Sequence, residues 1–308
     1  MQPERGERGL LRAQWERWRS TAACAGVGLL CVVAVVWLGD RSQQTRLGQA
    51  LDQAGMDVVA GDEATTRRLV GVLGNVSLGS IAVAVLVAVA VAVLRGRYVA
   101  AAAAAVLALG ANVTTQAIKA LTERADHGYL TVESFPSGHA TVVVSLVFAA
   151  LLVAPGAART TVSLVGSGAV TVTAAATLVA SWHRPADIVG ALLVSLAWGT
   201  AVLTTWSVLR GGMPSMASAR PHRIFATTGV VLAVAGLLAV GVRPGGGWGG
   251  FLDAGVVLAG IGLAAALTVT TFAQLAGPMA TGADTAGPTP GSLRERIRSW
   301  RAPRPGPP

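Results

Sequence analysis

The amino-acid sequence predicts an all-α protein, a polytopic bundle of transmembrane helices. The chain has 308 residues, of which 53% are hydrophobic and only 13% are charged, a balance too apolar for a soluble domain of this length. Its uncharged runs approach or exceed ~20 residues, the length that a helix needs to cross a bilayer. The runs are continuous instead of alternating, which favours helices over membrane strands. Eight such runs are expected to span the membrane, at residues 21–39, 69–94, 98–118, 140–155, 161–181, 187–209, 224–242 and 251–275.

These runs divide the chain into four parts. A basic amphipathic segment at residues 1–20 precedes a six-span core at residues 21–210. Two additional transmembrane helices follow at residues 211–276, and a basic, proline-rich tail occupies residues 277–308. The run at 140–155 is short, so we expect it to borrow residues from the polar turn that precedes it.

Charge is distributed unevenly along the chain. A net charge of +9 first suggests a nucleic-acid partner. Most of the arginines, however, precede the first span, follow the last span or occupy alternate loops, which places them on one side of the membrane. The positive-inside rule makes that side cytoplasmic. We therefore expect a multi-pass protein of the cell membrane with both termini in the cytoplasm, membrane lipids as neighbours, and no nucleic-acid partner.

Three further segments constrain the organisation. In residues 10–19 apolar side chains share one helical face and arginines the other, and residues 293–300 repeat this pattern. Both segments fit helices that lie on an anionic inner leaflet, and both also fit solvated basic tails. The outer connection at residues 40–68 can form a short helix at the membrane surface, but it shows no catalytic pattern. Cys24 and Cys31 share a helical face and do not indicate a disulfide framework.

A polar turn at residues 134–141 leads into the short fourth run. Pro136 is expected to end any preceding helix, and Ser137 is expected to cap the next one with its hydroxyl. Gly138 leaves the backbone open to an anion, and His139 falls in the first helical turn. A helix start with free amides, a hydroxyl and an imidazole forms a phosphate site. The alternative is an ordinary Pro-Ser-Gly helix start with a chance histidine.

Other polar residues gather at span edges on the same predicted outer side. Lys119, the only lysine in the chain, ends the third span, where it suits a phosphate oxygen or anchors the span at the interface. Asp187 follows His183 by four residues, in the first turn of a helix that Pro185 opens. The carboxylate can fix the imidazole tautomer and leave the other nitrogen free to attack phosphorus, or the pair can simply cap the sixth span. His222 is expected to be a polar residue of an inner loop.

These residues resemble the signatures of the type 2 phosphatidic acid phosphatase superfamily, membrane lipid phosphatases related to vanadium haloperoxidases. The resemblance rests on Lys119 with Arg124, on Pro136-Ser137-Gly138-His139, and on His183 with Asp187. Their order, their spacing and their places at span edges match the family over about residues 69–209, and the last two spans lie outside the resemblance.

The resemblance implies a role for each matching residue. His183 is the nucleophile that forms a phosphohistidine, Asp187 orients it, and His139 is the general acid that protonates the leaving group. The phosphoryl oxygens are held by cationic side chains, a hydroxyl and an amide, namely Lys119, Arg124, Ser137 and Gly138. No metal and no cofactor is implied, because cations and amides stabilise the charge of the transition state.

The sequence departs from the family's pattern in two places. Arg124 follows Lys119 after four intervening residues, where the family has Arg-Pro after six, and Asp126 occupies the usual arginine position. The family's Ser-Arg pair before the nucleophile is Ala176-Thr177 here. Arg184, next to the nucleophile, or Arg124 in a shifted loop is expected to replace the missing guanidinium; without a replacement, phosphate affinity or activity is lost.

We therefore expect an integral membrane phosphatase that hydrolyses a lipid phosphate or pyrophosphate, of polyprenyl or glycerolipid type, at the outer leaflet. Such an enzyme is a metal-independent hydrolase of the cell envelope. Two alternatives stay open: a phosphoryl transferase that uses the same intermediate, and a non-catalytic membrane protein that binds a lipid phosphate on a degenerate site.

Overall fold

The computed structural model describes residues 3–61, 63, 66, 67, 71, 78–129, 134–213, 220–239 and 250–280. Within these ranges the regular structure is helical, and no strand is present. The helices are α1 (Pro3–Gln44), α2 (Arg46–Val59), α4 (Leu78–Leu94), α5 (Tyr98–Leu121), α6 (Gly138–Val153), the 3-10 turn η1 (Gly156–Ala158), α7 (Arg159–Val179), α8 (Pro185–Leu209), α9 (Arg220–Ala239), α10 (Phe251–Leu275) and α11 (Gly277–Ala280).

The expected membrane fold is confirmed. Six helical segments of the described chain are long and apolar enough to cross a bilayer, within α1, α5, η1 with α7, α8, α9 and α10. Two further apolar helices, α4 with 17 residues and α6 with 16, occupy the positions of the second and fourth predicted runs. The protein is therefore an all-α, multi-pass membrane protein, and α6 is as short as the sequence indicated.

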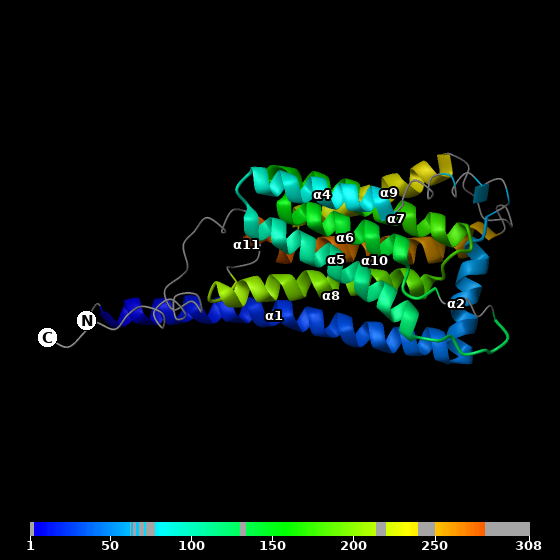
Figure 1. Cartoon of the computed structure of the whole chain (residues 1–308), viewed down its shortest axis with the longest axis horizontal. Coiled ribbons are helices and arrows are strands. Elements are labelled where there is room, and N and C mark those ends of the chain that lie inside the picture. Colours follow the sequence, from blue (N-terminus) through cyan, green and yellow to red (C-terminus); the bar gives the residue numbers. More distant parts are fainter. Residues whose placement is uncertain are drawn as a thin grey trace.

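The long helices lie side by side, and α2 crosses one end of them (Figure 1). Helix α1 packs along α8, α5 along α6, and α7 along α9, while α10 contacts α7, α8 and α9. The last two predicted spans, α9 and α10, are thus packed against the helices of the predicted core. Two stacked rings, Phe148 of α6 and Phe272 of α10, lie 4.0 Å apart between their centroids and belong to this contact.

The ends of the chain differ in part from expectation. The basic segment is helical from Pro3 onward, but this helix continues without a break into the first apolar run, and its N-terminal part extends beyond the bundle (Figure 1). The repeated pattern at residues 293–300 lies outside the described residues. The expected short helix in the connection 40–68 is present as α2, and Cys24 and Cys31 are buried and free.

The position of His222 differs from the one expected from the sequence. It is not a loop residue, because it lies in the first turn of α9 and is buried. Its Nδ1 lies 2.9 Å from Oγ of Ser163 on α7, whose hydroxyl is also 3.0 Å from the carbonyl oxygen of Arg159. His222 therefore belongs to the polar contact that fastens α9 to α7.

Close backbone approach between α7 and α9 depends on glycine. A Cβ on Gly229 of α9 would lie 2.0 Å from the carbonyl oxygen of Leu164 and 2.5 Å from Oγ of Ser167. Small residues of this kind let helices in lipid approach until their backbones touch. Gly236, seven residues further along the same helix, has no atom within 4 Å of the corresponding position.

We predict opposite effects of one added methyl group at these two glycines. Gly229→Ala should lower the midpoint of thermal unfolding of the purified protein in detergent, because overpacking costs about 1–3 kcal/mol. Gly236→Ala should leave the midpoint unchanged or raise it slightly, because alanine favours the helix by ~0.5–1 kcal/mol. Equal midpoints for the two variants would contradict the packing of α9 on α7.

Candidate functional site

Residues from the three sequence motifs meet at the end of the bundle that α2 crosses. Lys119 lies in the last turn of α5, His139 in the first turn of α6, and His183 just before α8. A Cβ on Gly138 would lie 3.9 Å from Nζ of Lys119, and the ring centroids of His139 and His183 are 6.2 Å apart. Residues up to 68 positions apart in the sequence, the separation of Lys119 and Asp187, thus converge on one place.

The start of α6 is built as the sequence indicated. Oγ of Ser137 accepts a hydrogen bond from the amide of Ala140 at 3.3 Å, which confirms Ser137 as the N-cap. The Phe135–Pro136 peptide bond is cis, and the ring of Phe135 is buried. The first amides of α6, those of Gly138 and His139, have no acceptor within the helix. Ser137 is completely buried, and the contact that its hydroxyl makes is the N-cap hydrogen bond of α6.

The tight fit of Phe135 fixes where α6 begins. Its ring fills the space beside two glycines, because a Cβ on Gly39 of α1 would lie 3.1 Å from it and one on Gly190 of α8 would lie 2.4 Å from it. The turn before α6 is thereby held between α1 and α8.

Asp187 joins the start of α8 to the start of α6. Its carboxylate is completely buried, and Oδ2 accepts a hydrogen bond from the amide of Arg184 at 2.8 Å. The same Oδ2 lies 3.4 Å from Nδ1 of His183, an ion-pair distance without an aligned hydrogen bond. The carbonyl oxygen of Asp187 accepts the amide of Ser137 at 2.9 Å. Asp187 therefore contacts both the imidazole of His183 and the start of α6.

Thr177 holds the other side of the histidine through its backbone. Its carbonyl oxygen accepts the amides of Trp182 at 3.0 Å and His183 at 3.3 Å. The Thr177 side chain is buried and donates to the carbonyl oxygen of Ala174 at 2.9 Å. The position at which the family carries an arginine is thus a closed structural site in this chain.

Two arginines reach the cluster instead. Arg124 is 6% exposed, and its Nη1 lies 3.4 Å from Oε1 of Gln43, while Nε and Nη2 have no hydrogen-bond partner in the described part of the chain. Arg184 is 4% exposed, and its Nη1 donates to Oγ of Ser134 at 3.0 Å. Asp126, by contrast, is exposed and accepts the amide of Gly128. In the loop after α5 the inward residue is therefore Arg124.

Helix α2 supplies residues that the sequence analysis missed. Oδ1 of Asp52 accepts the amide of Ala186 at 2.8 Å, and Gln53 lies 3.4 Å from Nε of Arg184. The sequence analysis found no catalytic pattern in residues 40–68 and did not predict these contacts between α2 and the start of α8. The signal was present in the spacing, because the buried residues of α2 recur every three or four positions and include polar ones: Gln49, Asp52, Met56 and Val59.

The corner between α1 and α2 also places Arg124. Nε2 of Gln49 donates to the carbonyl oxygens of Gln43 at 2.8 Å and Ala125 at 2.7 Å, and the amide of Ala125 donates to Gln43 at 3.1 Å. These bonds hold the backbone next to Arg124 against the end of α1. The guanidinium is thereby kept inside the cluster although the loop differs from the family's pattern.

Electrostatics in the cluster favour an anion. Burial, followed by the charge of Asp187, raises the pKa of Asp52 to about 7, against the lowering effects of the Ala186 amide and of Arg184 and Arg124. Burial and the charge of Arg184 lower the pKa of Arg124, against the effects of Asp52 and Asp187. Three basic side chains, those of Lys119, Arg124 and Arg184, therefore lie near two buried acidic side chains, Asp187 and Asp52, and the Asp52 carboxyl is partly protonated near neutral pH.

Comparison of the chain with protein-family models, with curated proteins and with solved structures gives no match. The described residues contain no group of three or more His, Cys, Asp or Glu side chains arranged to hold a metal ion. They do contain a cluster of basic side chains near the start of α6, in which Arg124 has two buried donors without a partner.

The raised pKa of Asp52 predicts how stability depends on pH. The folded protein holds this proton up to pH ~7, whereas the unfolded chain releases it near the ordinary value of 3.8. Between these values the folded state binds more protons, so the free energy of unfolding falls as pH rises. Asp52→Asn keeps an oxygen for the Ala186 amide and removes the titration. The unfolding midpoints of wild type and variant should agree near pH 4, and the variant should be the more stable at pH 8.

A difference between the two midpoints that stays constant from pH 4 to pH 8 would contradict the titration of Asp52. Asp57→Asn is the matched control, because Asp57 is an exposed residue of the same helix. Its variant should follow the pH profile of the wild type.

Proposed function

We propose that this protein is a membrane phosphatase that removes a phosphoryl group from a lipid phosphate or pyrophosphate through a phosphohistidine. The observation that carries the proposal is the pairing of His183 with the buried Asp187 beside the start of α6, in a cluster where Arg124 has two buried donors without partners. A structural ion pair would use those donors within the protein. Leaving them open in a buried cluster favours an anionic ligand.

The contact between His183 and Asp187 indicates which imidazole nitrogen is the nucleophile. Asp187 faces Nδ1 of His183 at 3.4 Å and favours the tautomer with its proton on that nitrogen. The lone pair is then on Nε2, which attacks phosphorus. The bond from phosphorus to the leaving oxygen breaks, and His139 gives its proton to that oxygen. Water, deprotonated by His139, then attacks the phosphohistidine, and phosphate leaves while Nε2 recovers its lone pair.

The cations and the helix start stabilise the charge that develops on the equatorial oxygens. Lys119 lies beside Gly138, whose amide is free for an oxygen, and Arg124 offers Nε and Nη2. Arg184 lies in the same cluster, which supports it as the replacement for the arginine missing at Thr177. Preorganised donors of this kind are worth ~3–4 kcal/mol each to the transition state.

The substrate class follows from the setting. The cluster lies at the ends of helices that cross a bilayer, so a substrate whose apolar part stays in the membrane can present its phosphate there. The uneven distribution of arginine supports an extracytoplasmic position for this end of the bundle and a cytoplasmic one for both termini. Polyprenyl and glycerolipid phosphates both fit.

Substitution of the catalytic residues gives the first test of this function. Phosphate release from a panel of lipid phosphates by the purified protein should be abolished by His183→Ala. His139→Ala should slow it ~10²–10⁴-fold, the usual contribution of a general acid. Asp187→Asn should also be severe, because the imidazole tautomer is lost. Activity should survive chelators.

Two outcomes would contradict this mechanism. Normal rates of phosphate release by the His183→Ala variant would rule out the phosphohistidine. If the wild-type protein binds a lipid phosphate but does not hydrolyse it, the non-catalytic alternative is favoured.

The role of Arg124 gives a second test. Arg124→Lys keeps the charge but cannot present two donors to a phosphate, so kcat/KM should fall ~10–100-fold. Arg46→Lys is the matched control, because Arg46 is an exposed residue at the start of α2, and its kinetics should match the wild type. Equal kcat/KM for both variants would show that the unpartnered donors of Arg124 do not contact the substrate.

A further inference from the structure

A groove lies between α5 and α8, far from the candidate phosphatase site. It has a volume of about 290 Å³ and is lined by apolar side chains that recur at helical spacing, including Val99, Ala103 and Val106 of α5 and Trp198, Val202 and Trp206 of α8. Its lining on α5 ends thirteen residues before Lys119, which corresponds to ~20 Å along the helix. The groove therefore cannot share the phosphate held by the site at the other end.

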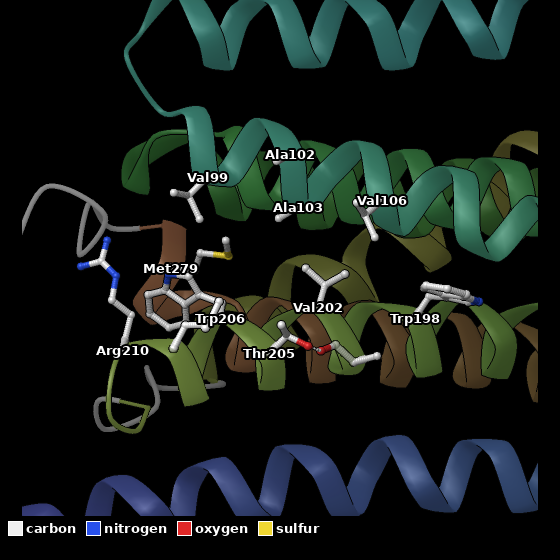
Figure 2. A pocket seen from close by; sticks show the side chains of 12 residues that line it. Val99, Ala102, Ala103, Val106, Trp198, Val202, Thr205, Trp206, Arg210 and Met279 are labelled. Atoms are coloured by element: carbon white, nitrogen blue, oxygen red, sulfur yellow. Dashed lines mark hydrogen bonds between the residues drawn. The ribbon is translucent and has the colours of Figure 1, made fainter. Parts of the chain in front are cut away.

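The groove has a polar end and an apolar body. Figure 2 shows Arg210, Trp206 and Met279 together at one end and Trp198 at the other. Trp206 is only 5% exposed, and its indole N–H is buried. This N–H has no hydrogen-bond partner in the described part of the chain. The indole of Trp198, in contrast, donates to Oγ1 of Thr114 at 2.9 Å. An unmet buried donor beside a guanidinium marks a place for an acceptor that carries negative charge.

The dimensions of the groove match one lipid chain. From Trp198 to Arg210 the α8 face covers ~18 Å, and half the hydrocarbon core of a bilayer is ~15 Å thick. The groove opens to the side of the bundle, because lining residues such as Val106 and Leu209 are exposed. A ligand can enter it from the bilayer.

We propose that this groove binds one acyl chain of an anionic phospholipid from the leaflet opposite the phosphatase site. The chain lies along α5 and α8, and a phosphate oxygen accepts the Trp206 N–H while the phosphate pairs with Arg210. The site is distinct from the substrate site and does not depend on the proposed phosphatase activity. The bound acyl chain would contact both α5 and α8, the helices that carry Lys119 and Asp187 at their opposite ends.

The test is lipid retention by the purified full-length protein. Native mass spectrometry in mild detergent compares dioleoylphosphatidylglycerol with dioleoylphosphatidylcholine, which has the same chains and no net charge. Wild type should retain phosphatidylglycerol at least about tenfold more strongly, the effect of one charge-assisted hydrogen bond. Equal retention of the two lipids would overturn the proposal.

Four variants locate the binding. Arg210→Gln should remove most of the preference for phosphatidylglycerol, whereas Arg95→Gln, at an exposed arginine outside the groove, should preserve it. Ala201→Phe should fill the groove and lower the retention of both lipids, whereas Ala25→Phe, on an exposed face of α1, should not. Wild-type retention in Arg210→Gln and Ala201→Phe would show that the lipids bind elsewhere.

A fifth variant separates binding from folding. Trp206→Phe keeps an aromatic ring in the groove and removes only the N–H, so the thermal unfolding midpoint should stay near that of the wild type. The preference for phosphatidylglycerol should nevertheless fall several-fold. An unchanged preference in this folded variant would contradict the assigned hydrogen bond.

Discussion

The buried carboxylate of Asp187 is the constraint on which the candidate site depends. A charge removed from water must be compensated by hydrogen bonds and opposite charges. Asp187 receives the Arg184 amide at 2.8 Å, faces the His183 imidazole at 3.4 Å and binds Ser137 through its backbone at 2.9 Å. These partners belong to the connection before α8 and to the start of α6. The requirement to compensate one charge thus places the proposed nucleophile beside the proposed phosphate-binding amides.

The second constraint is repulsion among the cations. Arg124 and Arg184 are both buried, and the charge of Arg184 helps to lower the pKa of Arg124 although Asp52 and Asp187 act in the opposite direction. Burial of Asp52 against the start of α8 raises the pKa of its carboxyl to about 7. A phosphate would supply the missing negative charge and the acceptors for Nε and Nη2 of Arg124. This charge balance supports the proposed anionic ligand over a purely structural role for the cluster.

Local signals predicted much of this end of the bundle. The N-cap at Ser137 and the helix start at Pro185 are consequences of nearby residues, and both are present. The contribution of Asp52 could not be read in the same way, because it depends on α2 folding back across the bundle to reach Ala186, 134 residues further on. His222 was misplaced for a related reason, since its burial comes from the packing of α9 on α7. Long-range contacts of this kind leave only a spacing of buried polar residues in the sequence.

The most direct test of the phosphohistidine is to trap it. Purified protein mixed with a lipid phosphate and quenched in alkali during turnover should carry one phosphoryl group, which acid removes because the phosphorus–nitrogen bond is acid-labile. Peptide mass spectrometry should place that group on His183, and His183→Ala should lack it. Phosphate release by a wild-type protein that never carries a phosphoryl group on His183 would contradict the proposed mechanism.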